Sequence, residues 1–173
     1  VEASVVVVSM EDSDKFGGDI TKIIVEKPHF YFSQILELMF GFDESGQGIS
    51  ASAYLGANVL ISDDVTVEPH VIIEDGAEIA NGVILRARCF IGKKVKIGRN
   101  SVVHPGALIL EECEIGDNCV IHSGAVVGGD GFGYVQENNE WIKVRQVGRV
   151  IINDACEIGC NTTIDRGSID NTI

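Results

Sequence analysis

Most of the chain follows a hydrophobic pattern that repeats every six residues. From residue 49 to residue 127, every sixth position holds Ile, Leu or Val without an exception. These positions are Ile49, Leu55, Ile61, Val67, Ile73, Ile79, Leu85, Ile91, Ile97, Val103, Ile109, Ile115, Ile121 and Val127. A smaller residue (Ala, Val, Cys or Ser) follows each of the first thirteen by four positions. A helix repeats every 3.6 residues and a half-buried strand every two, so this pattern indicates a solenoid of hexapeptide repeats.

The spacing predicts a parallel β-helix with three faces per turn. Residues eighteen apart would then stack about 4.8 Å above one another, and each coil would bury its neighbours. Glycine often follows the aliphatic residue, which indicates close backbone approach or an unusual φ at a corner. These glycines are Gly56, Gly92, Gly98, Gly116 and Gly128. An antiparallel sandwich is the alternative, but it would show turn clusters every 8–12 residues and a shifting phase.

Residues 1–46 do not keep the six-residue step and predict a small α/β domain. Two β-branched runs, at residues 3–8 and 21–25, predict buried strands. Pro28 can open a helix, which we expect from about 29 to 40. Its apolar stripe predicts core packing and consists of Phe32, Ile35, Leu36 and Met39. Residues 41–48 are expected to be a linker, so the solenoid domain would span residues 47–173.

The six-residue register breaks after Val127 and returns at Ile152, twenty-five residues later. Because twenty-five is not a multiple of six, we expect residues 128–149 to be extruded as a loop. This loop holds the only tryptophan, Trp141. The register fails again after Ile164. Loops that leave a rigid scaffold commonly carry function, so both breaks are candidate sites.

Composition limits the location and the partners of the protein. A net charge of −13 argues against a nucleic-acid-binding surface. No apolar run reaches the about 18 residues of a membrane span, and no signal peptide is evident, so we expect a cytoplasmic protein. The sequence starts at Val1 and stops within a repeat. Because open solenoid ends expose core and unpaired strands, we expect a fragment that is cut at both ends and whose C-terminal coils are missing.

The five cysteines are expected to be buried free thiols. Cys89, Cys113, Cys119 and Cys156 fall on the small-residue column, and Cys160 lies just beyond it. The spacing lacks the Cys-x2-Cys pairs and the Cys/His clusters that are typical of zinc sites. Buried cysteine usually acts as a small hydrophobic residue.

Two histidines and a run of basic residues are further candidates for chemistry. His104 and His122 are eighteen residues apart and should stack on an outer corner, in one column with Glu68 and Arg86. Such a pair could be a base, a pH-sensitive patch or a metal site, or only a solvated column. A third ligand is not evident, so we expect no metal.

Six of the thirteen basic residues lie between residues 86 and 99: Arg86, Arg88, Lys93, Lys94, Lys96 and Arg99. They could hold a phosphorylated ligand or an acidic carrier protein, or form a charged outer wall. The glycine-rich segment 128–134 lacks the Lys-Ser/Thr of a P-loop.

The segments around the two breaks carry a specific resemblance. They read VVGGDGFGY (126–134), QVGRVII (146–152) and EIGCNTTIDRGSIDNTI (157–173). In this combination the chain resembles the UDP-3-O-acylglucosamine N-acyltransferases of lipid A biosynthesis. The resemblance implies a left-handed parallel β-helix, part of a uridine-binding N-terminal domain, and a homotrimer with active sites between neighbouring solenoids.

The resemblance also implies a reaction and a set of site residues. A 3-hydroxyacyl group would pass from the thioester of acyl carrier protein to the 2-amine of a UDP-3-O-acylglucosamine, with no further cofactor. The family's catalytic histidine belongs to a motif that residues 1–173 do not contain, so no catalytic residue is assigned and the fragment is expected to be inactive. Asp130, Phe132, Tyr134, Asp165 and Arg166 match motifs near the acyl and pantetheine groove. Asp165 and Arg166 could instead pair with each other to hold a bulge.

Two other functions stay open. One is a different hexapeptide acyltransferase that uses another nucleotide sugar or acetyl-CoA. The other is a β-helix scaffold without acyltransferase activity, either an interaction scaffold or a protein of γ-carbonic-anhydrase type. Zinc bound at a subunit interface would support this second function.

Overall fold

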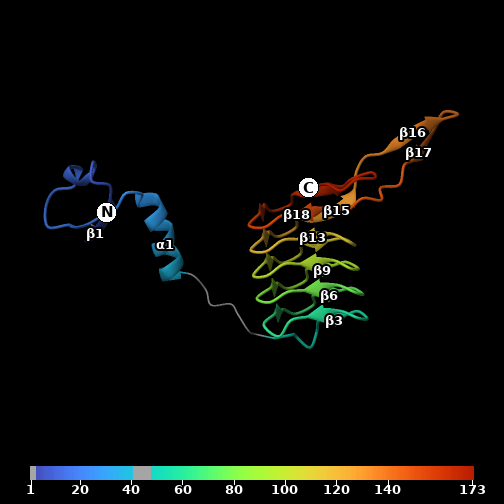
Figure 1. Ribbon diagram of the computed structural model, residues 1–173, viewed down its shortest axis with the longest axis horizontal. Helices are drawn as coiled ribbons and strands as arrows, with labels where there is room; N and C mark the ends of the chain where they lie inside the picture. The colour runs from blue at the N-terminus through green and yellow to red at the C-terminus, as the bar shows by residue number, and fades with distance from the viewer. Residues whose placement is uncertain (1–2, 41–47) are drawn as a thin grey trace. The chain divides into compact units, whose positions relative to one another are not determined.

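The computed structural model describes residues 3–40 and 48–173, which fall into two compact units, Val1–Asp43 and Glu44–Ile173 (Figure 1). Most of the expected linker at 41–48, and the expected domain boundary after residue 46, lie outside the described residues.

The N-terminal unit contains two parallel strands and one helix. Strand β1 (Val5–Val8) pairs with β2 (Thr21–Ile24), and the short 3-10 helix η1 (Ser13–Lys15) lies between them in sequence. Helix α1 (Pro28–Phe40) begins at the proline that the sequence marks as a helix start. Proline suits this position because the first turn of a helix has no partner for its N–H.

The prediction that these strands and the helix stripe are buried was wrong. Val8 is the only buried hydrophobic residue described in this unit. Phe32, Leu36 and Met39 are 53%, 40% and 67% exposed. A two-stranded sheet and a single helix, as described for residues 3–40, do not supply enough facing surface to cover an apolar stripe.

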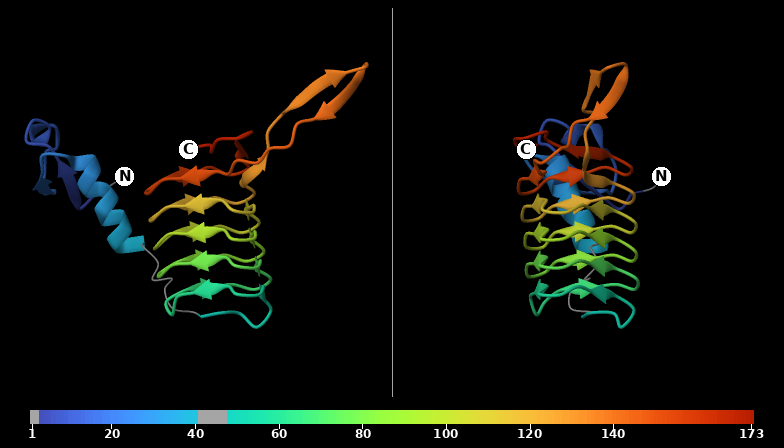
Figure 2. Two further views of the ribbon diagram at one scale, coloured as in Figure 1. Left: turned by 45° about the vertical axis from the view of Figure 1, so that its right-hand side comes forward. Right: turned by 90° about the vertical axis from the view of Figure 1, so that its right-hand side faces the viewer.

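The second unit is the parallel β-helix with three faces that the repeats predict, with the left-handed sense that the resemblance implies (Figures 1 and 2). Its strands form three parallel sheets, which we name by face. The first face has the order β18-β13-β10-β7-β4, the second β19-β14-β11-β8-β5, and the third β20-β15-β12-β9-β6-β3.

Most strands of the β-helix are two residues long. Those of the first face are β4 (Leu60–Ile61), β7 (Glu78–Ile79), β10 (Lys96–Ile97), β13 (Glu114–Ile115) and β18 (Ile151–Ile152). Those of the second are β5 (Thr66–Val67), β8 (Ile84–Leu85), β11 (Val102–Val103), β14 (Val120–Ile121) and β19 (Glu157–Ile158). Those of the third are β3 (Tyr54–Leu55), β6 (Ile72–Ile73), β9 (Phe90–Ile91), β12 (Leu108–Ile109), β15 (Val126–Asp130) and β20 (Thr163–Arg166).

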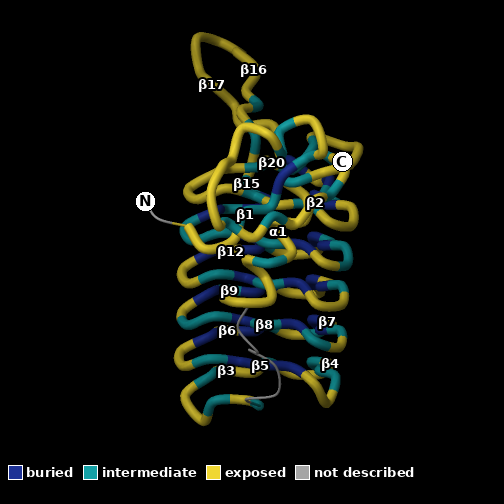
Figure 3. Tube along the Cα trace, turned by 90° about the vertical axis from the view of Figure 1, so that its left-hand side faces the viewer, coloured by how far each residue is buried: buried dark blue, intermediate teal, exposed yellow. Residues whose placement is uncertain are grey.

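Residues eighteen apart stack as the spacing predicts. Ile97 pairs with Ile79 on one side and with Ile115 on the other. The aliphatic and small-residue columns together form one continuous core along the coils (Figure 3). Between residues 49 and 127, Ser101 is the one buried polar member of these columns; its hydroxyl donates to Gly116 O at 2.8 Å and accepts from Cys119 N at 2.9 Å. Each fully buried Val, Leu or Ile contributes about 1.5–3 kcal/mol, so the core is the main source of stability.

Two backbone features shape the corners, namely close approach at glycine and positive φ. The sequence indicated the first of them. After the aliphatic residue, glycine allows close approach: a Cβ on Gly98 would lie 2.4 Å from Gly116 C. Three residues after the aliphatic position, the backbone turns through positive φ, at Asn100 with 55° and at Gly106 with 72°. Arg88 and Glu112 also adopt this conformation, at 63° and 64°. Such residues are uncommon in left-handed backbone, so at these two positions the sequence gives no signal for the second column.

The expected extrusion between coils is present. Glu114 pairs with Ile151, thirty-seven residues on, whereas stacked partners in the preceding coils are eighteen apart, so nineteen extra residues leave the coil. Strand β15 continues through Asp130 and pairs with β20, with a bulge between Val127 and Gly129. Residues 128–130 therefore belong to the third face, and the extrusion begins later than the expected residue 128. We call residues 131–149 the arm.

Candidate functional site

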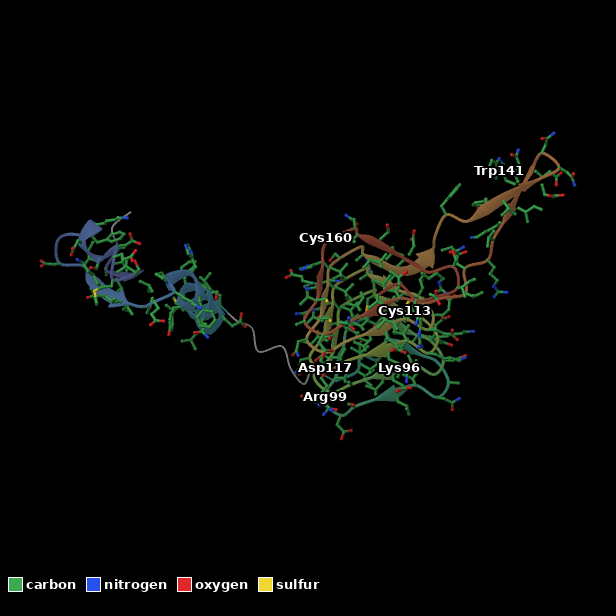
Figure 4. The ribbon with its side chains drawn as sticks, turned by 45° about the horizontal axis from the view of Figure 1, so that its top comes forward. Lys96, Arg99, Cys113, Asp117, Trp141 and Cys160 are labelled. Atoms are coloured by element: carbon green, nitrogen blue, oxygen red, sulfur yellow. The ribbon has the colours of Figure 1, made fainter. Side chains whose placement is uncertain are left out.

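The arm is an antiparallel hairpin that projects from the β-helix (Figures 2 and 4). Strand β16 (Tyr134–Glu137) pairs with β17 (Glu140–Lys143), and every residue of both strands is exposed. At the tip, Asn138 and Asn139 have φ of 50° and 64°, which suits a two-residue type I′ turn. Phe132 is 93% exposed and Trp141 67%. The arm thus presents aromatic side chains without a core of its own.

An ion pair joins the returning leg of the arm to the end of β15, at the base of the arm. Lys143 contacts Asp130 through Nζ and Oδ2. The hydrogen bond from Lys143 holds the pKa of Asp130 below its usual range, and the same bond raises the pKa of Lys143. The rings of Phe132 and Tyr134 lie 5.2 Å apart on the outgoing leg.

Arg166 fixes the bulge from which the arm departs. Its Nε donates to Gly128 O at 2.8 Å, and its Nη2 donates to Glu111 O at 3.2 Å and lies 3.3 Å from Glu111 Oε1. The Arg166 side chain is only 9% exposed. The alternative that Arg166 holds the bulge therefore fits, but through Gly128 and Glu111 rather than through Asp165.

Three of the five predicted site residues meet on neighbouring strands. In the β15–β20 pairing, Asp130 lies opposite Arg166 and Gly129 opposite Asp165. Phe132 and Tyr134 follow directly on the outgoing leg. Stacking of the coils thus brings together residues that are 36 positions apart in sequence. That these residues bind substrate stays a prediction.

Sequence reasoning missed a buried glutamine at the base of the arm. Gln146 is only 6% exposed. A signal for it exists in the sequence: Gln146 stands six residues before Ile152, in the aliphatic phase of the resumed register. A polar residue in an inward phase predicts a side chain that is held by hydrogen bonds.

A groove of about 690 Å³ runs along the first face and reaches the base of the arm. Small residues that follow the strands line it, among them Ala80, Gly98 and Gly116. Charged pairs stand beside them: Lys96 Nζ lies 3.1 Å from Glu78 Oε1, and Arg149 Nη1 lies 2.8 Å from Glu114 Oε1. Because Arg149 is the last residue of the arm, this second pair connects the arm to the groove.

The predicted histidine stack is confirmed on the corner between the second and third faces. The rings of His104 and His122 lie 4.9 Å apart and nearly parallel, at 13°. His122 Nε2 lies 2.6 Å from Glu157 Oε1. In the part of the chain that the structure describes, no group of three or more His, Cys, Asp or Glu side chains could hold a metal ion.

Glu68 and Arg86 continue the same column. Arg86 Nη1 donates to Glu68 Oε1 at 2.6 Å, and Ala87 N donates to Glu68 Oε2 at 2.8 Å. Burial alone would raise the pKa of Glu68, but these hydrogen bonds outweigh it and hold the pKa below its usual range. The contacts favour a structural role for this part of the column.

The basic residues between 86 and 99 do not form one patch. Fourteen residues cover most of an eighteen-residue coil, so these side chains are distributed around the β-helix. Several pair with acidic residues of neighbouring coils: Arg86 with Glu68, Lys94 with Glu112, and Lys96 with Glu78. This arrangement favours the charged outer wall over a single anion site.

The burial prediction holds for Cys89, Cys113 and Cys119, is met only in part by Cys156, and fails for Cys160. Cys89, Cys113 and Cys119 are buried, Cys156 is half-buried, and Cys160 is exposed because it lies at a corner outside the column. Burial raises the pKa of Cys89 to about 12, which leaves its thiol unreactive at neutral pH.

Comparison with known proteins agrees with this architecture. The family model described as bacterial transferase hexapeptide (six repeats) matches residues 52–87 and 94–129. A UDP-3-O-acylglucosamine N-acyltransferase of Coxiella burnetii (strain RSA 493 / Nine Mile phase I) is 39% identical, over 89% of this chain and 45% of the relative. One of Methylobacillus flagellatus is 36% identical, over 99% of this chain and 48% of the relative. The chain therefore carries bacterial transferase hexapeptide repeats and is similar to these N-acyltransferases over most of its length.

The chain spans about half the length of the curated relatives that it matches. Within the described residues, no helix has both the length and the apolar character needed to cross a membrane.

Proposed function

We propose that the whole protein transfers a 3-hydroxyacyl group from acyl carrier protein to the 2-amine of a UDP-3-O-acylglucosamine, in lipid A biosynthesis. The observation that carries the proposal is the similarity to N-acyltransferases of that name, which extends over 89–99% of the chain and so includes the arm. The protein would act in the cytoplasm as a homotrimer, with the carrier-protein thioester as co-substrate and no further cofactor.

The arm and the groove suit the two ends of such a donor. An acyl group is apolar and would pack on the exposed aromatic residues Phe132 and Tyr134. The groove of the first face extends over successive coils, and small residues alternate in its lining with aliphatic and charged ones, which suits a thin extended thioester arm. Asp130, Asp165 and Arg166 would hold these elements where the arm leaves the coil.

The chemistry needs a general base for the attacking amine and donors for the tetrahedral oxyanion. We propose that neither His104 nor His122 is that base. They stack on each other, and His122 is bonded to Glu157, on a corner that the groove does not touch. Replacing either by alanine in the full-length protein is expected to leave kcat within about threefold, since one positioned base usually contributes 10²–10⁴-fold.

The test is acyl transfer by the purified full-length protein, with product identified by mass spectrometry. Turnover of 3-hydroxyacyl carrier protein with the UDP-sugar supports the proposal. Preference for acetyl-CoA would indicate a different hexapeptide acyltransferase, and zinc bound at a subunit interface without acyl transfer would indicate a scaffold of γ-carbonic-anhydrase type. A loss of about 10²-fold or more in the His122→Ala variant would contradict the assignment of the histidine pair.

A further inference from the structure

Gln146 is the only described side chain of the arm that is both polar and buried. It stands at a position of the register that is otherwise aliphatic, yet its side chain has a hydrogen-bond acceptor, Oε1, and a donor, Nε2. A buried amide that lost its partners would cost about 1–3 kcal/mol, so its contacts define where the surrounding segments must lie.

The two ends of the Gln146 amide bind different segments. Its Oε1 accepts a hydrogen bond from Ser168 Oγ at 2.7 Å, and its Nε2 donates to Val144 O at 3.1 Å. Ser168 follows β20 on the next pass of the chain, whereas Val144 belongs to the returning leg of the arm. The side chain therefore connects the arm to the coil above the bulge.

The outgoing leg is held against the same side chain. A Cβ on Gly133 would lie 2.6 Å from Gln146 Nε2, so a larger residue at this position would require the Gln146 amide to shift. Val144 N donates to Gly133 O at 2.8 Å, which closes the two legs against each other. Next to this point, Val147 N donates to Ser168 O and Gly148 N donates to Gly167 O, each at 3.0 Å.

We propose that Gln146 is a positioning residue that sets the direction in which the arm leaves the β-helix. It contacts both legs and the following coil at one point, and the remainder of the arm has no core. The proposal rests on the proposed function in one respect: if Phe132 and Tyr134 bind the acyl donor, Gln146 determines how well they are placed for it.

The discriminating variant is Gln146→Met, which keeps the size of the side chain and suits the aliphatic phase but removes both hydrogen bonds. Amide hydrogen exchange at Val144, Val147 and Gly148 is expected to accelerate on the order of tenfold, while thermal unfolding of the β-helix stays unchanged. Ser168→Ala removes one bond and should give a smaller acceleration. Gln136→Met is the matched control, because Gln136 is exposed on β16 and should leave these amides unaffected.

In the full-length enzyme, Gln146→Met is expected to raise KM for the acyl donor on the order of tenfold and to change kcat less than about threefold, because a mobile arm weakens binding without touching the reacting atoms. Unchanged exchange rates, or an unchanged KM in an active enzyme, would overturn the proposal. If the wild-type protein does not use acyl donors, the proposed function fails, and the exchange experiment alone decides whether Gln146 holds the arm.

Discussion

At the scale of single residues, glycine marks the places where one coil touches the next. The Cβ that alanine would add at Gly98 falls 2.4 Å from the carbonyl carbon of Gly116, and at Gly116 it falls 2.6 Å from Asp154 N. Backbone cannot move away without disturbing the strand pairing above it. These glycines are required by close approach and not by φ.

Gly98→Ala is therefore expected to destabilise the β-helix by at least about 2 kcal/mol, through forced separation of two coils. Urea unfolding followed by circular dichroism measures this change. Gly159→Ala is the matched control: Gly159 also follows an aliphatic strand residue, but its added Cβ would meet only Thr162 Oγ1 at 3.6 Å. Equal losses in the two variants would show that close coil contact is not the cause.

The sequence predicted which residues form the core more fully than it predicted the backbone conformation at the corners. Ile97 or Leu85 is recognisable as buried because aliphatic side chains recur in phase. The left-handed corner at Arg88, Lys94 or Glu112 is not recognisable, because these residue types rarely adopt positive φ. Stacking of coils enforces that conformation against the local preference.

At the scale of elements, the arm shows what an interrupted register can and cannot predict. The twenty-five-residue interval indicated that a segment leaves the coil. It did not indicate that the segment pairs with itself as β16 and β17, or that Asn138 and Asn139 form its turn. Those features depend on pairing between residues on the two legs, and the sequence carries only a weak signal for such pairing.

The Asp130–Lys143 ion pair predicts a response of the arm to acid. The pKa of Asp130 is lowered in the folded arm, so the stabilisation is present above the ordinary aspartate pKa and is lost as pH falls through the lowered value. Because the pKa of Lys143 is raised, the bond persists at neutral pH and is lost only as pH rises through that raised value.

Time-resolved fluorescence anisotropy of Trp141, the only tryptophan, should thus report a more mobile arm at acid pH, below the ordinary aspartate range. Circular dichroism on the same samples separates this change from unfolding of the β-helix. Lys143→Met should show the mobile arm already at neutral pH. If that variant titrates like the wild type, the ion pair does not hold the arm.

At the scale of the whole β-helix, the outer faces differ in character. The outward column of the third face is apolar: Tyr54, Ile72 and Leu108 are 59%, 41% and 36% exposed, and Phe90 lies between them, half-buried. The corresponding column of the first face carries Glu78, Lys96 and Glu114. A continuous exposed apolar stripe is typical of a protein contact, so the proposed homotrimer would use the third face.

Leu108→Glu is expected to weaken the trimer of the full-length protein by at least about tenfold in Kd, since it places a charge in an apolar contact. Sedimentation velocity over a range of concentrations measures the effect. Leu60→Glu makes the same change on the first face, where it should leave the trimer intact. Dissociation by Leu60→Glu alone would place the contact on the first face instead.

By itself, the sequence determined the period of the β-helix, the identity of its core columns and the point at which a segment leaves the coil. These follow from short-range regularity, because each six-residue unit repeats the same burial pattern. The same regularity explains why the histidine pair could be placed correctly, since residues eighteen apart must stack.

Only the tertiary structure decided how the candidate site is built. Arg166 binds Glu111 and Gly128, fifty-five and thirty-eight residues away, and Gln146 binds both Val144 and Ser168. The contacts of Arg166 arise where the register is broken, so the repeat gives no rule for them. The physical reason is that a repeat specifies stacking between equivalent positions, whereas an extruded arm is held by unique contacts that form only after the coils have stacked.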